Sequence, residues 1–421
     1  MKRITIILLF FSQLVFAQNI KISLKECYDQ MLLNYPLAND SEIYNQTSEL
    51  KNKNLNADWL PKVEFKAQAT YQSDVVAFDL NIPIPGIELP EAAKDQYKAT
   101  IDVNQMIYDW GRIKSAKKIE ECNLKINQQT TFVELNKLKE QINKFYFAIL
   151  ILQKNEELLN IMLSDIDQKQ LTIESGVKNG VLLQSDLYTL QAEKLKLKQS
   201  INQIANQRLA AVQILAEITG IDLSSNVQLV LDDYQLNNKN EFNRPEHDLF
   251  NYQMQQLDVS AKSISNQNMP LIFAFGQLGY GKPGLNMLND EFDSFYYVGI
   301  GLSWKFWDWN QNRRQRDILS LNKNLVQNKL DGFNKQLQVA LNNEIANIEN
   351  HQSALISDQE IIKLREEITK SAFAKLENGV ITSTQYITEL SAETQAKINY
   401  ETHKIQLIQS KVNYLYIIGE I

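Results

Sequence analysis

The chain contains the same series of landmark residues twice. Two prolines recur 209 residues later, while an Asp-Trp pair, an Asn-Gly-Val tripeptide and a glycine recur 199 residues later. The landmarks are Pro36, Pro61, Asp109-Trp110, Asn179-Gly180-Val181 and Gly220, which return as Pro245, Pro270, Asp308-Trp309, Asn378-Gly379-Val380 and Gly419. Solenoid repeats are far shorter, roughly 20–50 residues. The spacing therefore predicts a duplicated, domain-sized element. Its function should be read from the features that both copies share.

The repeat also predicts the domain boundaries. The register drops by ten between Pro61 and Asp109, so the first copy contains an insertion there, and the proline-rich segment 81–90 lies in that interval. We expect a first repeat over 18–220, a linker over 221–244 and a second repeat over 245–421.

Residues 1–17 have the features of a secretory signal peptide. Lys2 and Arg3 precede an apolar stretch over 4–11, and Ala17 ends a segment suited to cleavage. Gln18 follows in place of the cysteine of a lipoprotein, so we expect no lipid anchor. In an exported protein Cys27 and Cys122 could pair, although their separate helical surroundings favour two unpaired thiols.

Long helices are expected in both copies. The chain has only 14 glycines and 8 prolines, and none between residues 112 and 175, a length that would form a helix of about 100 Å. Heptad spacing of apolar residues predicts a partner helix over 185–218, with Arg208 interrupting its seam and Glu156 interrupting the facing one. The second copy repeats the pair over 312–377 and 384–418, so each copy contains a helical hairpin with the Asn-Gly-Val tripeptide at its tip.

Between the prolines and the Asp-Trp pairs the period changes to two. After Pro61 the apolar residues Val63, Phe65, Ala67, Ala69 and Tyr71 alternate with polar ones, which is typical of a strand. We expect strands at about 62–76, 98–109, 270–281 and 294–307. Gln105 breaks the alternation once, and Leu271, Phe273 and Phe275 blur it. Such strands suit a soluble hairpin or an outer-membrane barrel.

The tryptophans favour the membrane interpretation. All five lie within about four residues of Pro61, Asp109 or Asp308, where helices and strands should meet, and would form a belt at one membrane interface. The belt residues are Trp59, Trp110, Trp304, Trp307 and Trp309. Four strands cannot close a barrel and lipid does not tolerate open edges. The chain must therefore oligomerise to close a barrel, and three copies, a homotrimer, would give twelve strands, an even number in the usual range.

In this order and repeated twice, the motifs resemble the TolC-like outer-membrane channel family over the whole mature chain. The motifs are residues 22–27 leading to Asn34-Tyr35-Pro36, Trp59-Leu60-Pro61, residues 108–112, Arg244-Pro245-Glu246 and the two hairpins that end at Gly220 and Gly419. The resemblance implies a mainly α fold with a periplasmic α-barrel and a 12-stranded β-barrel closed by a trimer. It also implies an outer-membrane location, a periplasmic adaptor of the membrane fusion type and an inner-membrane RND, ABC or MFS transporter as partners.

The resemblance also assigns roles at the hairpin tips. It implies a periplasmic gate at Asp186, six residues after Gly180, and at the second-tip positions Gln385 and Thr388. Since Gln385 stands where the family has an aspartate, no acidic ring is expected at the second tip. Asp186 could equally cap its helix. Asn179-Gly180-Val181 and Asn378-Gly379-Val380 match the adaptor-docking position, and both also suit a turn that needs glycine.

The sequence predicts a passive exit duct of a tripartite efflux pump or a type I secretion system. Three histidines, His247, His351 and His403, stand far apart in the sequence, no nucleophile or phosphate-binding motif appears, and no cofactor or metal is expected. The net charge of −7 disfavours nucleic acid. The alternative is a periplasmic coiled-coil adaptor or scaffold, which would not need paired strands or a tryptophan belt.

Overall fold

The computed structural model describes residues 21–76, 93–223, 227–236 and 242–421, so the predicted signal peptide and segment 81–90 lie outside the described residues. The described chain forms two compact units, and each takes residues from both repeats. The helical unit lies within Met1–Ala38, Phe132–Pro245 and Asn334–Ile421; the sheet unit is Asn39–Thr131 and Glu246–Phe333.

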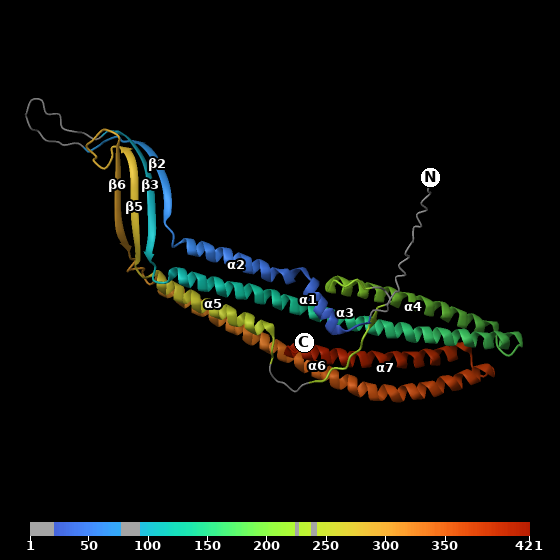
Figure 1. Cartoon of the computed structure of the whole chain (residues 1–421). Helices are drawn as coiled ribbons and strands as arrows, with labels where there is room; N and C mark the ends of the chain where they lie inside the picture. Colours follow the sequence, from blue (N-terminus) through green and yellow to red (C-terminus); the bar gives the residue numbers. More distant parts are fainter. Residues whose placement is uncertain (1–20, 77–92, 224–226, 237–241) are drawn as a thin grey trace, which may run out of the picture. The chain divides into compact units, whose positions relative to one another are not determined.

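Four long helices dominate the fold (Figure 1). α3 (Arg112–Lys178) and α6 (Gln311–Glu377) each have 67 residues, and α4 (Gln184–Thr219) and α7 (Ser383–Ile418) each have 36. The predicted class, mainly α with paired strands from both halves, is confirmed. Among the described residues, no helix combines the length and the apolar character that crossing a bilayer demands.

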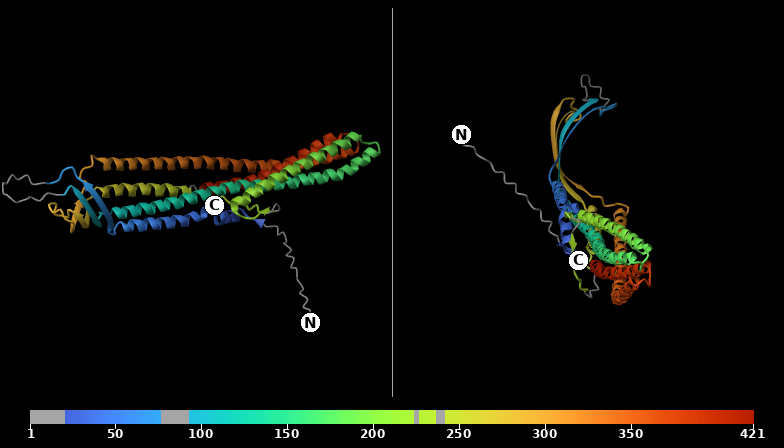
Figure 2. Two further views of the ribbon diagram at one scale, coloured as in Figure 1. Left: turned by 90° about the horizontal axis from the view of Figure 1, so that it is seen from above. Right: turned by 90° about the vertical axis from the view of Figure 1, so that its right-hand side faces the viewer.

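The helical unit has two apolar cores. The first gathers around α1 (Leu24–Asn34), which begins with a capping box between Ser23 and Glu26, and includes Met31, Ile142 and Leu215. A short parallel pair, β1 (Lys21–Ile22) and β4 (Gln228–Leu229), adds apolar residues to it. The second core joins both hairpins near their tips, where they lie side by side (Figure 2).

The two polar interruptions in the first hairpin seam pair with each other. Arg208 Nε on α4 donates to Glu156 Oε2 on α3 at 2.9 Å, and both side chains are largely buried. The seam tolerates these two charged side chains because they pair with each other. Either one alone would be a half-buried charge without a partner.

The sheet unit contains one four-stranded antiparallel sheet in the order β2-β3-β5-β6. Its strands are β2 (Lys62–Tyr71), β3 (Asp95–Tyr108), β5 (Leu271–Lys282) and β6 (Asp293–Ser303). The register brings the predicted apolar residues to one face, for example Phe65 opposite Ile101 and Ile101 opposite Leu278. These side chains are exposed, so the sheet presents an uncovered apolar face.

Polar contacts join the helices beside the sheet. α2 (Asp40–Ala57) meets α3 through the ion pair of Lys51 with Glu120 at 3.2 Å, and α5 (Pro245–Gln267) meets α6 through Lys323 and Asp258 at 2.8 Å. Exposed pairs of this kind contribute little stability, typically below about 1 kcal/mol.

Each repeat ends against the residue two positions before its first landmark proline, Pro36 or Pro245. Gly220 and Gly419, the residues after α4 and α7, have φ of 69° and 81°. A Cβ on Gly220 would lie 2.6 Å from Asn34 Cβ, and one on Gly419 would lie 2.1 Å from the backbone oxygen of Asn243. Asn34 and Asn243 occupy equivalent positions, 209 residues apart. Both glycines thus combine a left-handed backbone with close packing.

We expect Gly419→Ala to lower the apparent Tm, because the new Cβ would clash with a backbone atom and the left-handed conformation adds about 1 kcal/mol. Gly332→Ala is the matched control, since Gly332 lies inside α6 with no atom within 4 Å of its would-be Cβ. That change should raise stability by roughly 0.5–1 kcal/mol. Melting followed by circular dichroism tests both; a Gly419→Ala protein as stable as the parent would contradict the packing argument.

Candidate functional site

The two hairpin tips have the same backbone construction. Gly180 and Gly379 adopt φ of 72° and 68° just after α3 and α6. The following valines, Val181 and Val380, each donate a backbone N–H to a carbonyl of the preceding helix, at Gly176 and Lys375, both at 2.9 Å. Glycine is the residue that adopts this left-handed conformation without a Cβ penalty.

Asp186 joins the two tips. Its Oδ2 accepts the backbone N–H of Leu183 at 3.2 Å, at the start of its own helix α4. Its Oδ1 accepts the buried backbone N–H of Ser383 at 2.8 Å, at the start of α7 in the other hairpin. One carboxylate therefore lies at the positive N-terminal ends of two helices, where negative charge is favoured. The capping role considered from the sequence is present, and it extends to a second helix.

The other two candidate gate residues bond within α7. Gln385 Oε1 accepts the Thr382 N–H at 3.0 Å, completing a capping box, and the Thr388 hydroxyl donates to the Thr384 carbonyl at 2.9 Å. The three candidates therefore share the tip region, and Asp186 forms a hydrogen bond to the other hairpin.

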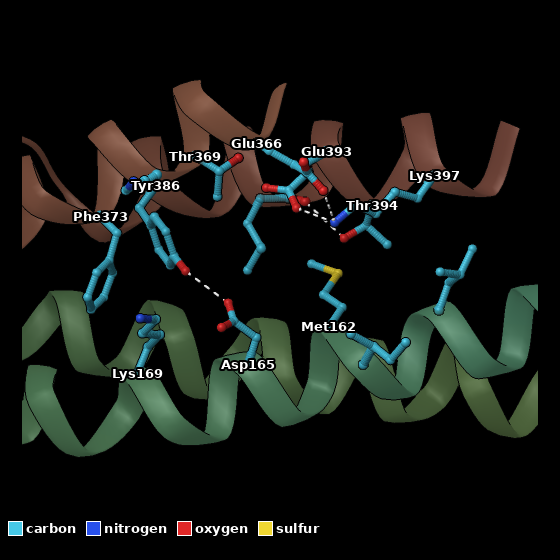
Figure 3. A pocket seen from close by; sticks show the side chains of 14 residues that line it. Met162, Asp165, Lys169, Glu366, Thr369, Phe373, Tyr386, Glu393, Thr394 and Lys397 are labelled. Atoms are coloured by element: carbon cyan, nitrogen blue, oxygen red, sulfur yellow. Dashed lines mark hydrogen bonds and ion pairs between the residues drawn. The ribbon is translucent and has the colours of Figure 1, made fainter. Parts of the chain in front are cut away.

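Side-chain contacts also connect the hairpins behind the tips (Figure 3). The Tyr386 hydroxyl on α7 donates to Asp165 Oδ2 on α3 at 3.2 Å, and Lys169 Nζ lies 3.8 Å from the centre of the Phe373 ring on α6. Burial, ahead of the charge of Asp165, raises the pKa of Tyr386, so its hydroxyl stays protonated as a donor. These residues line a cavity of about 390 Å³ between the hairpins.

A charge cluster on the cavity wall belongs to the second hairpin alone. Lys397 on α7 lies 2.9 Å from Glu366 on α6 and 2.7 Å from Glu393 on its own helix. Burial lowers the pKa of Lys397, but its hydrogen bonds to the two carboxylates outweigh burial and raise it. The lysine therefore stays charged and joins α6 to α7.

The predicted docking residues include exposed apolar groups. Val181 and Val380 are 53% and 69% exposed, respectively, although each lies at the end of a well-packed hairpin. The carbonyl oxygen of Val181 would lie 3.1 Å from a Cβ on Gly379, so the two tips approach each other closely. Asn179 and Asn378 donate to the preceding turn of their own helices.

The Asp-Trp landmarks form the turns between strands and helices. Trp110 and Gly111 have φ of 54° and 82°, and Trp309 and Asn310 have 53° and 59°. Two consecutive left-handed residues are unusual for bulky side chains. The preceding aspartates satisfy the next helix: Asp109 accepts the N–H groups of Gly111 and Ile113, and Asp308 accepts that of Asn312 at 3.0 Å.

All five tryptophans lie in the sheet unit and are exposed, from 37% for Trp59 to 76% for Trp309. The Trp307 and Trp309 rings meet edge to face at 5.6 Å. The belt role remains a prediction that rests on these positions.

A second aromatic group, not predicted from the sequence, lies at the opposite ends of the strands. Phe292 contacts the rings of Tyr97 and Tyr280 at 6.1 and 5.5 Å, and Tyr71 and Tyr296 lie near the same ends. From Tyr296 to Leu302 the exposed apolar residues of β6 extend about 20 Å at roughly 3.4 Å per residue. These tyrosines could have been found in the sequence from their positions at the ends of the predicted strands, but not from their spacing.

Two histidines that are distant in the sequence meet in the helical unit. The rings of His351 on α6 and His403 on α7 are 5.8 Å apart, and His403 Nδ1 lies 2.7 Å from Asp358 Oδ2. Burial, followed by His403, lowers the pKa of His351. No group of His, Cys, Asp and Glu side chains within the described ranges is arranged to hold a metal ion. Both cysteines are buried free thiols.

The comparisons with known proteins agree with this architecture. Residues 29–221 match the family model of outer membrane efflux proteins. Comparison with curated proteins gives no match. Among solved structures, the chain is similar to the outer membrane protein VceC of Vibrio cholerae, with a TM-score of 0.69, 12% identity, and coverage of 94% of this chain and 96% of that one.

Two further structures share the fold at similar levels. The CmeC outer membrane channel of Campylobacter jejuni has a TM-score of 0.66 at 14% identity, over 94% of this chain and 85% of that one. The open state of the Neisseria gonorrhoeae MtrE outer membrane channel has 0.67 at 13% identity, over 94% and 88%. At these identities the likeness establishes the fold.

We expect Asp186→Ala to loosen both helix starts, because two backbone N–H groups lose their acceptor. Hydrogen exchange measured by mass spectrometry should rise at residues 183–186 and at 383–386. Thr382→Ala is the control: it removes a cap from α7 alone, so exchange should rise there and stay unchanged around Leu183. Confinement of the Asp186→Ala effect to α4 would contradict the double role.

The cap at Asp308 should make stability depend on pH. The N–H of Asn312, foremost among several donors, lowers the pKa of Asp308. Its stabilisation is therefore complete above the ordinary carboxyl pKa of about 3.9 and is lost as pH falls through the lowered value. The apparent Tm difference between the parent protein and Asp308→Ala should shrink between about pH 6 and pH 3. A Tm difference that stays the same from pH 6 to pH 3 would contradict this role of the cap.

Proposed function

The chain belongs to the outer membrane efflux protein family through residues 29–221, and from this we propose that it is the outer-membrane exit duct of a tripartite efflux pump or a type I secretion system. The family is one of passive channels rather than enzymes, located in the outer membrane. Transport through such a duct requires no bond chemistry, and an inner-membrane transporter supplies the energy.

The observation that carries this proposal is the uncovered apolar face of the β2-β3-β5-β6 sheet. A soluble protein rarely leaves an apolar patch of this size in water. Lipid would cover the face, and the edge strands β2 and β6 would then need partners. Pairing β2 of one copy with β6 of the next gives a closed barrel, and three copies supply twelve strands. A coiled-coil adaptor or scaffold has no use for such a sheet.

The tips support a gate and a docking site. The exposed valines Val181 and Val380 offer apolar contact to a periplasmic adaptor of the membrane fusion type. The bonds from Asp186 to Ser383 and from Tyr386 to Asp165 hold the two hairpins of one protomer together. An adaptor opens the gate if it binds the separated hairpins better than the joined ones.

Single-channel conductance of the purified protein in planar bilayers tests the duct. We expect a pore whose block by divalent cations weakens in Asp186→Ala. Equal block in both proteins would keep the duct and leave Asp186 as a helix cap. The duct would be refuted if a well-folded trimer inserted into the bilayer but did not conduct under any condition, and if gate variants did not restore conductance.

The gate contact has its own test. Tyr386→Phe removes the hydroxyl that donates to Asp165 while keeping the buried ring, so we expect a higher open probability with little change in stability. Tyr400→Phe is the matched control, because the Tyr400 hydroxyl accepts from Gln359 within the second hairpin alone. Channels with equal open probability in both variants would argue against a role for the Tyr386 contact.

A further inference from the structure

The two repeats differ on the polar side of the sheet. On β2 and β3 this face carries Glu64, Lys66, Gln68, Thr100 and Asp102. On β5 and β6 the same face carries Phe273, Phe275, Phe295 and Tyr297, which we term the aromatic strip. These phenylalanines include the residues that blur the alternation in the sequence.

Three rings of the strip lie over glycines of the neighbouring strand. Phe273 is opposite Gly301, Phe275 opposite Gly299, and Phe295 opposite Gly279. A Cβ added to these glycines would come within 2.2 to 2.6 Å of the ring Cζ. Each ring therefore occupies the space above the glycine backbone that a side chain at that position would fill, so the rings lie close to the sheet.

Three rings of the strip are in contact with one another, and the fourth, Phe295, already holds a cation. The rings of Phe273 and Phe275 are 6.1 Å apart, and those of Phe275 and Tyr297 are 6.2 Å apart. Lys98 Nζ lies 5.2 Å from the centre of the Phe295 ring, which is itself 7% exposed. Tyr297 is 41% exposed, and Phe273 and Phe275 are half-buried.

Covering glycines is one use of aromatic side chains in sheets. However, the first repeat forms its pair of strands without any aromatic residue or glycine on this face. The fold thus does not require pairs of an aromatic residue with a glycine. Their presence in the second repeat alone calls for another cause.

We propose that the aromatic strip binds planar aromatic cations as they pass through the barrel. The proposal rests on the proposed function, in which the polar side of the sheet faces the lumen. Ring faces attract cations and stack with flat aromatic molecules, and the Lys98 contact with Phe295 is the same interaction made within the chain. The neighbouring carboxylate of Asp102 is engaged by Lys66 and Gln277, so the rings of Phe273, Phe275 and Tyr297 are the sites left for a cation beside it.

The test uses block of single channels by ethidium, a planar aromatic cation, and by tetrabutylammonium, a cation without rings. Both are added on the barrel side. A variant with Phe273→Leu, Phe275→Leu and Tyr297→Leu keeps apolar cover over the glycines. We expect its ethidium residence time to fall about tenfold, with tetrabutylammonium block and salt conductance unchanged.

Lys98→Gln provides a second variant that leaves the strip intact. It frees the Phe295 ring, so ethidium residence should lengthen while tetrabutylammonium block changes less. Ethidium block that is equal in the parent and the leucine variant, or tetrabutylammonium block that changes to the same extent, would overturn the inference. A failed duct would appear differently, as absence of conductance in the parent protein.

If the triple variant does not yield channels, Tyr297→Leu alone decides the question. Tyr297 lies opposite Gln277 rather than a glycine, so its loss leaves the glycine cover in place. We expect a residence time about threefold shorter; no change would count against the strip.

Discussion

The open edges of the sheet are the constraint on which the rest of the structure depends. Among the described residues, β2 and β6 each have a paired strand on one side only, which leaves their outer edges open, while one face of the sheet is apolar and uncovered. In hydrocarbon, an unpaired backbone N–H or C=O costs several kcal/mol. A chain with this sheet is therefore stable in a membrane only as a closed assembly. The rigid Asp-Trp turns matter for the same reason, since they fix where each strand stops and its long helix begins.

The helical unit depends on the satisfaction of backbone groups by side chains. The N-terminal starts of α4 and α7 share Asp186, and Arg208 pairs with Glu156 across the seam of the first hairpin. Apolar packing around Ile166, Leu190 and Leu376 provides most of the stability, whereas the polar contacts determine which helices lie together. A contact that contributes specificity at modest energetic gain is suited to being broken and remade.

The sequence predicted the elements well because they follow regular periods. Heptads and the absence of proline and glycine indicated the hairpins, and alternation after Pro61 indicated β2. Contacts between distant segments could not be predicted in this way. Nothing local connects Asp186 with Ser383 or Phe275 with Gly299, because pairing depends on register and helix rotation. The blurred alternation at Phe273 and Phe275 was visible, yet its meaning required the glycines of the neighbouring strand.

The packing of Gly220 on Asn34 and of Gly419 on Asn243 makes each repeat a closed segment of chain with two strands and one hairpin. In the proposed twelve-stranded barrel, a gene encoding one such repeat would need six subunits to supply the strands that three double-length chains would provide. Fusion lowers the number of association steps. It also removes the requirement that neighbouring sectors of the ring be identical. The charged sector of β2 and β3 and the aromatic sector of β5 and β6 could then diverge while the backbone stayed the same.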